Sequence, residues 1–201
     1  MRSTYVRSDA EVIADARGRP EEFTELYRRH SAPVFRYIAS RLDRGLAEDL
    51  RSETFLVAFE RRGAFRAEAQ SALPWLLGIA TQLIRQRRRE EAASWRLAAA
   101  VDGLGGEGTA RLESDPAAEV DARLDATTAV RSISLAITKL SRGDRDVLGL
   151  AAWSELDTAG IAESLGIPEG TVRSRLHRAR RILRAHLDAD RLGDKRHGGT
   201  P

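Results

Sequence analysis

The sequence predicts an all-α fold: two small helical domains joined by a flexible acidic linker. Apolar residues recur at three- and four-residue steps along most of the 201 residues, which is the period of helices with one buried face. No run of alternating β-branched residues bounded by turn signals predicts a strand. A stretch rich in Gly and acidic residues interrupts the helical pattern near the middle, which divides the chain into two parts.

Composition and charge narrow the class of protein. The chain contains no cysteine, so disulfides and thiolate metal sites are excluded. Its 33 Lys and Arg residues nearly balance its 30 Asp and Glu residues, but the two signs gather in different parts of the chain. Neither the apolar segment of a signal peptide nor a long apolar membrane span occurs. We therefore expect a cytoplasmic protein with no membrane insertion.

The first domain is expected over residues 11–91. Apolar residues at helical spacing predict helices over about 20–37, 46–62 and 73–89, with Pro33 marking a bend or a restart. The middle helix has apolar residues on two sides, which is typical of a helix sandwiched within its own domain. Trp75, near the start of the third helix, is interpreted as a buried anchor, with a base-stacking role as the alternative.

Residues 92–127 are expected to form the linker. Residues 102–125 contain seven acidic residues and two arginines. Gly103, Gly105 and Gly108 form a GxGxxG pattern, which in a nucleotide-binding fold lies between a strand and a helix. Neither element is predicted on its two sides, so we interpret the segment as a flexible connector.

The second domain is expected over residues 128–187. Ser141 predicts the N-cap of one helix, and Asp157 or Thr158 predicts the cap of a short helix that ends at Gly166. Pro168 suits the first turn of the long basic helix that follows. Residues 188–201 are expected to form a disordered tail.

The two last helices form a helix-turn-helix pattern, whose second helix enters the major groove of DNA. On a helical wheel, an apolar stripe faces the core and consists of Val172, Leu176, Ala179 and Leu183. The opposite face is expected to bind DNA through Arg173, Ser174, His177, Arg178 and Arg181. Free backbone N–H groups at Gly170 and Thr171 would favour a phosphate. A solvated charged face is the alternative, and the scarcity of acidic residues on the helix disfavours it.

Two blocks of the sequence resemble the extracytoplasmic-function (ECF) group of the sigma-70 family, the bacterial RNA polymerase sigma factors. FTELYRRHSAPVFRYIASRL, AEDLRSETFLVAFE and FRAEAQSALPWLLGIATQLIRQRRRE are similar to region 2, and AITKLSRGDRDVLGLAAWSELDTAGIAESLGIPEGTVRSRLHRARRIL is similar to region 4. The resemblance implies a factor that binds core RNA polymerase and promoter DNA and commonly has an anti-sigma factor as a partner. Region 4 would read the minus-thirty-five element, and region 2 would read the minus-ten element and help to open the duplex. No cofactor or metal is expected.

The resemblance also assigns residues to each contact. Core polymerase would bind Asp49, Ser52 and Glu53 in AEDLRSETF, where Ser52 replaces the usual Gln. The minus-thirty-five element would meet the residues that the helical wheel turns outward, Arg173, Ser174, His177 and Arg178. The minus-ten element would meet a base-capturing loop over residues 66–71 and the helix after it, through Arg66, Gln70, Gln82, Gln86, Arg85 and Arg88. Arg85 and Arg88 would attract DNA phosphates, with an ordinary charged helix end as the alternative. Gln82 and Gln86 stand where the family often has Asn; both amides bind adenine bidentately, but Gln is one methylene longer.

Two other classes of protein fit parts of the sequence. A self-contained regulator that binds operators as a dimer would use the helix-turn-helix, but it leaves the AEDLRSETF block and the linker unexplained. An enzyme acting on nucleic acid would need a catalytic motif. The four histidines have no metal-ligand spacing, and no P-loop or paired-carboxylate motif occurs. The chain is therefore not expected to be an enzyme.

Overall fold

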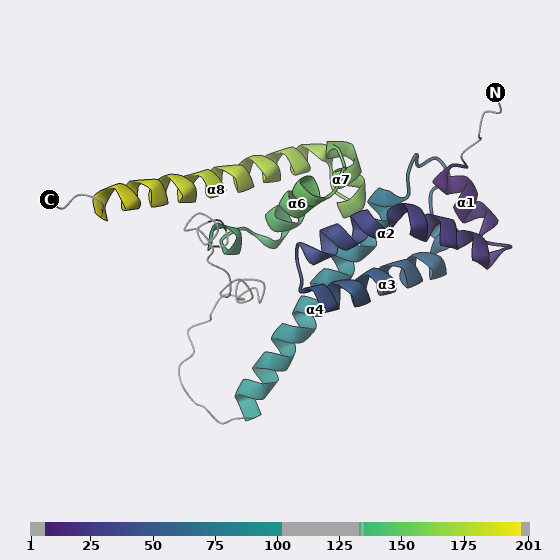
Figure 1. Ribbon diagram of the computed structural model, residues 1–201, viewed down its shortest axis with the longest axis horizontal. Helices are drawn as coiled ribbons and strands as arrows, with labels where there is room; N and C mark the ends of the chain where they lie inside the picture. Colours follow the sequence, from purple (N-terminus) through teal and green to yellow (C-terminus); the bar gives the residue numbers. More distant parts are fainter. Residues whose placement is uncertain (1–6, 102–132, 134, 198–201) are drawn as a thin grey trace.

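A computed structural model describes residues 7–101, 133 and 135–197. Every regular element within these ranges is a helix, which confirms the all-α prediction (Figure 1). Most of the predicted linker, residues 102–127, lies outside the described residues. Its first ten residues, 92–101, form the last part of a long helix rather than a connector. We refer to residues 7–101 as the N-terminal lobe and to residues 135–197 as the C-terminal lobe.

The N-terminal lobe consists of four α-helices and two short 3-10 helices. They are α1 (Asp9–Asp15), η1 (Pro20–Glu22), α2 (Phe23–Ala39), α3 (Arg44–Glu60), η2 (Arg62–Ala64) and α4 (Leu73–Val101). Helix α3 packs against both α2 and α4, and Leu50 and Phe55 are buried on its two sides. This arrangement confirms the sandwiched helix that its two apolar sides predicted.

Local signals explain where these helices begin. Ser8 and Glu11 form a capping box at the start of α1, a helix too short to be predicted from its apolar period. Asp43 accepts a hydrogen bond from the Leu46 amide at 3.0 Å and caps α3. Helix α2 runs through Pro33 without ending there. The predicted restart is absent because the buried face of α2 continues on both sides of Pro33.

After a helical stretch at residues 135–138, the C-terminal lobe contains α6 (Arg142–Trp153), α7 (Thr158–Leu165) and α8 (Glu169–His197). The predicted caps are present: Ser141 Oγ accepts from the Asp144 amide at 3.1 Å, and Asp157 Oδ1 accepts from the Gly160 amide at 2.8 Å. Gly166 has φ 62° and ψ 38°, the left-handed conformation that ends α7.

Helix α8 continues to His197, so residues 188–197 are helical where the sequence analysis expected a disordered tail. The extension projects away from the other helices (Figure 1). Once a helix is nucleated, each further residue adds one hydrogen bond at little cost. Residues 188–197 contain no proline, so the helix can propagate past the end of its packed part.

The two lobes pack against each other and share one hydrophobic core. Helix α4 lies against α7, and α2 lies against α6. Val147, Leu150 and Ile161 of the C-terminal lobe belong to the same buried cluster as the core of the N-terminal lobe. Gly78 allows the close approach of α4 to α7, because a Cβ at this position would lie 2.6 Å from the Ser164 carbonyl oxygen.

Within the described residues, no helix combines the length and the apolar character that crossing a lipid bilayer requires.

Candidate nucleic-acid interface

The outward face of α8 carries the residues that the helical wheel selected. Val172 and Ala179 are fully buried and hold α8 against α6 and α7. On the opposite side, the five predicted DNA-binding side chains are exposed: Arg173, Ser174, His177, Arg178 and Arg181. The structure therefore confirms the orientation of this face, and its excess of guanidinium groups suits a polyanion.

Two acidic residues of the same lobe meet this basic face. Arg178 Nη1 lies 3.3 and 3.4 Å from the carboxylate oxygens of the buried Asp144. Arg173 Nη2 lies 3.6 Å from the carboxylate of Glu169. Because the Arg178 side chain remains 52% exposed, Asp144 can orient it without covering it.

The first turn of α8 is less open to a phosphate than the sequence predicted. The Thr171 amide donates to the Pro168 carbonyl at 2.9 Å, so its N–H group is already used. The Thr171 N–H group is occupied because the first turn, from Pro168 to Thr171, closes a 3-10-type hydrogen bond between residues three apart. Gly170 is exposed at the helix start.

Two further arginines extend the basic face along α8. A hollow between α7 and α8 is lined by Thr158, Arg173, Leu176, His177, Arg180, Arg181, Arg184 and Ala185. Arg180 and Arg184 were not selected from the sequence. Arg180 lies one turn from His177 and Arg184 lies one turn from Arg181, and this spacing was the signal that could have identified them.

The predicted polymerase-binding residues share one exposed face of α3. Asp49, Ser52 and Glu53 are all exposed, and Ser52 Oγ donates to the Glu48 carbonyl at 3.1 Å. Leu56, one turn beyond Ser52, is 57% exposed. Leu56 was not predicted as part of this surface, although its spacing places it on the same face. The surface therefore combines negative charge with one apolar side chain.

Both ends of the predicted base-capturing loop, residues 66–71, are held in place. Before the loop, the ring of Phe65 packs on Trp75 with a centroid separation of 5.2 Å. Trp75 is partly buried against the core, which favours the anchor that the sequence predicted over a base-stacking role. Arg66 and Gln70, the loop residues chosen for DNA contact, are exposed.

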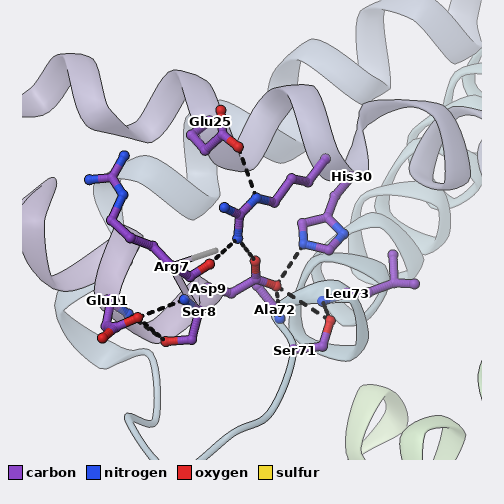
Figure 2. A network of polar contacts seen from close by, with 10 residues as sticks. Arg7, Ser8, Asp9, Glu11, Glu25, His30, Ser71, Ala72 and Leu73 are labelled. Atoms are coloured by element: carbon purple, nitrogen blue, oxygen red, sulfur yellow. Dashed lines mark hydrogen bonds and ion pairs between the residues drawn. The ribbon is translucent and has the colours of Figure 1, made fainter. Parts of the chain in front are cut away.

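The far end of the loop is held by Asp9 (Figure 2). Asp9 Oδ2 accepts from the Ala72 amide at 2.8 Å, just before α4 begins, and lies 2.7 Å from His30 Nε2. Asp9 Oδ1 accepts from Arg29 Nη1 at 3.0 Å. Three elements, α1, α2 and the start of α4, thus meet at one carboxylate that is only 6% exposed.

The environment of Asp9 favours its charged form. Burial alone would raise the pKa of Asp9, but hydrogen bonds from His30 and the Ala72 amide outweigh burial and hold that pKa well below its ordinary range. This site could not be predicted from sequence, because Asp9 and Ala72 are 63 positions apart.

The predicted minus-ten residues of α4 fall into two groups. Gln82 and Gln86 are exposed one turn apart, and Gln86 Nε2 donates to Glu90 Oε1 at 2.9 Å. Arg85 and Arg88 are half-buried and bind other parts of the protein instead. Arg85 Nη2 is 2.7 Å from Asp146 Oδ2 of α6, and Arg88 Nη2 donates to the Arg41 carbonyl at 3.1 Å.

Nothing in this part of the chain indicates a metal centre. Among the described residues, no group of three His, Asp or Glu side chains is arranged to hold a metal ion.

Comparisons with known proteins agree with the two-lobe arrangement. Residues 26–94 match the family model "Sigma-70 region 2", and residues 131–183 match "Sigma-70, region 4". The chain is 38% identical to the ECF RNA polymerase sigma factor SigL of Mycobacterium tuberculosis over 164 residues, which span 81% of this chain and 86% of SigL.

Two solved structures share the fold. CnrH, solved in complex with the cytosolic domain of CnrY, superposes with a TM-score of 0.62 at 24% identity and covers 92% of this chain and 99% of its own. The sigma factor RpoE of Bartonella quintana, solved with the anti-sigma factor NepR, superposes with a TM-score of 0.58 at 22% identity. The match covers 85% of this chain and 99% of the RpoE chain.

Proposed function

Because the chain belongs to the ECF group of the sigma-70 family, we propose that its two lobes divide promoter recognition between them. As a sigma factor it is a non-catalytic subunit that binds core RNA polymerase and DNA and directs promoter-specific transcription initiation. In the proposed division, the C-terminal lobe reads the minus-thirty-five element as duplex. The N-terminal lobe holds core polymerase and reads the minus-ten element as the duplex opens.

The observation that carries this proposal is the outward face of α8. Arg173, His177 and Arg178 are exposed on the side of α8 opposite the buried Val172 and Ala179. A guanidinium fork can donate two hydrogen bonds to guanine in the major groove, which is the most frequent specific contact of this kind. The pairing of Arg178 with Asp144 limits the orientations of its side chain before DNA arrives. We assign base contacts to Arg178 and phosphate contacts to Arg181.

The minus-ten role rests on an exposed polar surface beside an anchored loop. Gln82 and Gln86 can offer amide groups to unpaired bases, and the loop over residues 66–71 can receive a base that leaves the stack. Extruding a base costs a few kcal/mol, which contacts to the single strand must offset. Arg66 and Gln70 are exposed at this loop and supply a cation and an amide for that purpose.

Core polymerase is proposed to dock on the exposed face of α3. Asp49 and Glu53 supply negative charge, and Leu56 supplies an apolar contact that is 57% exposed in the free chain. Interfaces commonly place an apolar residue inside a polar rim. The partner surface would therefore be basic at its edge and apolar at its centre.

An anti-sigma factor is proposed as a further partner, acting in the cytoplasm where the polymerase works. The support is the fold shared with RpoE of Bartonella quintana, which was solved with its anti-sigma factor. Such a partner would cover the polymerase-binding face of α3, the DNA-binding face of α8, or both.

Transcript mapping tests the proposed function. The purified chain is added to core polymerase on genomic DNA, and the 5′ ends of the transcripts are sequenced. We expect start sites that share two upstream sequence elements at a fixed spacing. Start sites that share no element would contradict the proposal. Specific binding of the chain to duplex DNA as a dimer, without polymerase, would favour the operator-binding regulator instead.

A further inference from the structure

We propose that Asp9 is a positioning residue for base capture, because its carboxylate fixes the end of the capture loop to the rest of the N-terminal lobe. The inference rests on the proposed minus-ten role of the loop over residues 66–71. Asp9 itself would touch no DNA. It would act through the Ala72 amide, to which it is bound at 2.8 Å.

The contacts of Asp9 are directed at the junction between loop and helix. Ala72 is the residue immediately before α4, and Ser71 is the last residue of the loop. Ser71 Oγ lies 3.4 Å from Asp9 Oδ2 and accepts a hydrogen bond from the Leu73 amide at 3.2 Å. The Ala72 amide just before α4 and the Leu73 amide at its start therefore find acceptors in Asp9 and Ser71, which substitute for the missing preceding turn.

The position of Asp9 is in turn set by contacts from two residues of α2, Arg29 and His30. Arg29 Nη1 donates to both Asp9 Oδ1 at 3.0 Å and the Arg7 carbonyl at 2.8 Å, and Arg29 Nε donates to Glu25 at 3.0 Å (Figure 2). His30 lies against the other carboxylate oxygen. A carboxylate with fixed partners on both oxygens has little freedom, so the loop end that it binds is fixed too.

The rest of the loop depends on this attachment. Phe65 anchors the start of the loop on Trp75, and one turn inside the loop is closed by the Ala69 amide donating to the Arg66 carbonyl at 3.1 Å. Arg66, Glu68 and Gln70 are exposed, and Ala69 is the loop residue that packs partly against the core. Without the Asp9 contact, the end of the loop after Ala69 would have to be ordered when the base binds, which weakens capture.

The test uses holoenzyme with Asp9→Asn, which keeps the size of the side chain but removes its charge. The control is Asp15→Asn, which removes another acid of α1. Asp15 pairs with Arg7 at 3.1 Å and with Arg19 at 3.4 Å, and these pairs do not involve the loop. The DNA probe is a promoter found by transcript mapping, with a pre-melted minus-ten bubble and one base changed at a time.

Asp9→Asn should reduce the preference for the correct base in the bubble about fivefold, the change expected from losing one capping contact. Core polymerase binding and binding to the minus-thirty-five duplex should stay at the wild-type level. Hydrogen exchange of the Ala72 amide should become faster, while amides in α3 keep their protection. Asp15→Asn should leave base preference and Ala72 exchange unchanged.

Equal losses of polymerase binding, duplex binding and base preference would overturn the inference and make Asp9 a general stabilising residue. An unchanged base preference in Asp9→Asn would overturn it as well. If Asp9→Asn does not fold, Ser71→Ala serves the same test, and wild-type Ala72 exchange and base preference in that variant would overturn the inference. Wild-type holoenzyme that shows no base preference in the bubble would instead contradict the proposed minus-ten role of the loop.

Discussion

Asp146 Oδ2 lies 2.7 Å from Nη2 of Arg85, so a carboxylate of the C-terminal lobe neutralises a cation of α4. The other oxygen, Asp146 Oδ1, accepts from Arg41 Nη2 at 2.8 Å. The Asp146 side chain is only 3% exposed. Arg85 was expected to meet the DNA phosphates near the minus-ten element, but its Nε and Nη2 groups already bind Asp146. Packing of the lobes therefore competes with DNA for part of the Arg85 guanidinium.

Removal of the Asp146 charge should weaken the packing of the lobes and release Arg85. Asp146→Asn should lower the free energy of unfolding by about 3 kcal/mol, because Arg41 and Arg85 lose a buried partner. It should also raise the affinity of the free chain for single-stranded DNA. Urea unfolding and fluorescence anisotropy measure the two effects.

Glu155→Gln is the matched control for this substitution. Glu155 joins the lobes through an exposed pair with Arg36 at 3.0 Å, and such pairs contribute less than about 1 kcal/mol. Equal destabilisation by the two variants would show that the buried position of Asp146 does not matter.

Charge reversal on α3 should abolish binding to core polymerase. Asp49→Arg combined with Glu53→Arg places two cations on an exposed face, so the helical fold should be retained. The two cations should repel the basic surface of core polymerase that is proposed to dock there. Co-elution on gel filtration measures binding, and far-ultraviolet circular dichroism measures the fold. Glu21→Arg with Glu22→Arg offers a comparison away from α3. Undiminished co-elution of the α3 variant would remove this face from the polymerase contact.

Two arginines of α8 should differ in their effect on DNA binding. Arg178→Ala should cost about 1–3 kcal/mol on the correct minus-thirty-five sequence and little on other sequences, because a base contact is lost. Arg181→Ala should weaken binding to all sequences about equally, since a phosphate contact carries no sequence information. Competition binding with matched and mismatched duplexes distinguishes them, and the reverse pattern would exchange their roles.

Acid should destabilise the fold through Asp9. Its carboxyl has a pKa held below the ordinary range in the folded chain, despite burial, by hydrogen bonds from His30 and the Ala72 amide. Such a group stabilises fully above its unfolded-state pKa, and the contribution is lost as the pH falls toward the folded-state pKa. Asp9→Asn should therefore be less stable than wild type at pH 7, with a difference that shrinks below about pH 4. Urea unfolding at several pH values measures this, and a difference independent of pH would count against it.

The sequence was sufficient for features whose cause is local. The outward face of α8 follows from the period of Val172 and Ala179, and the starts of α6 and α7 follow from Ser141 and Asp157. Each of these signals lies within a few residues of the structure it produces. Gln82 and Gln86 were selected from the family resemblance rather than from a local signal, and both are exposed.

Contacts between distant parts of the chain had no such signal. Arg41 and Asp146 are 105 positions apart, and Asp9 and Ala72 are 63 positions apart. A buried carboxylate needs cations or N–H groups around it, but the sequence does not tell which ones the fold will supply. For this reason Arg85 was predicted as a free phosphate contact, and Asp9 was not considered.

The claim that the N-terminal lobe reads opened DNA is tested most directly by permanganate reactivity of thymines in the minus-ten region. Holoenzyme with Gln82→Ala and Gln86→Ala should still bind the promoter through α8 but should open it poorly, so these thymines should react weakly on duplex DNA. A pre-melted bubble should restore only the part of the defect that is due to melting. Wild-type reactivity of the double variant on ordinary duplex would contradict the role proposed for the two glutamines.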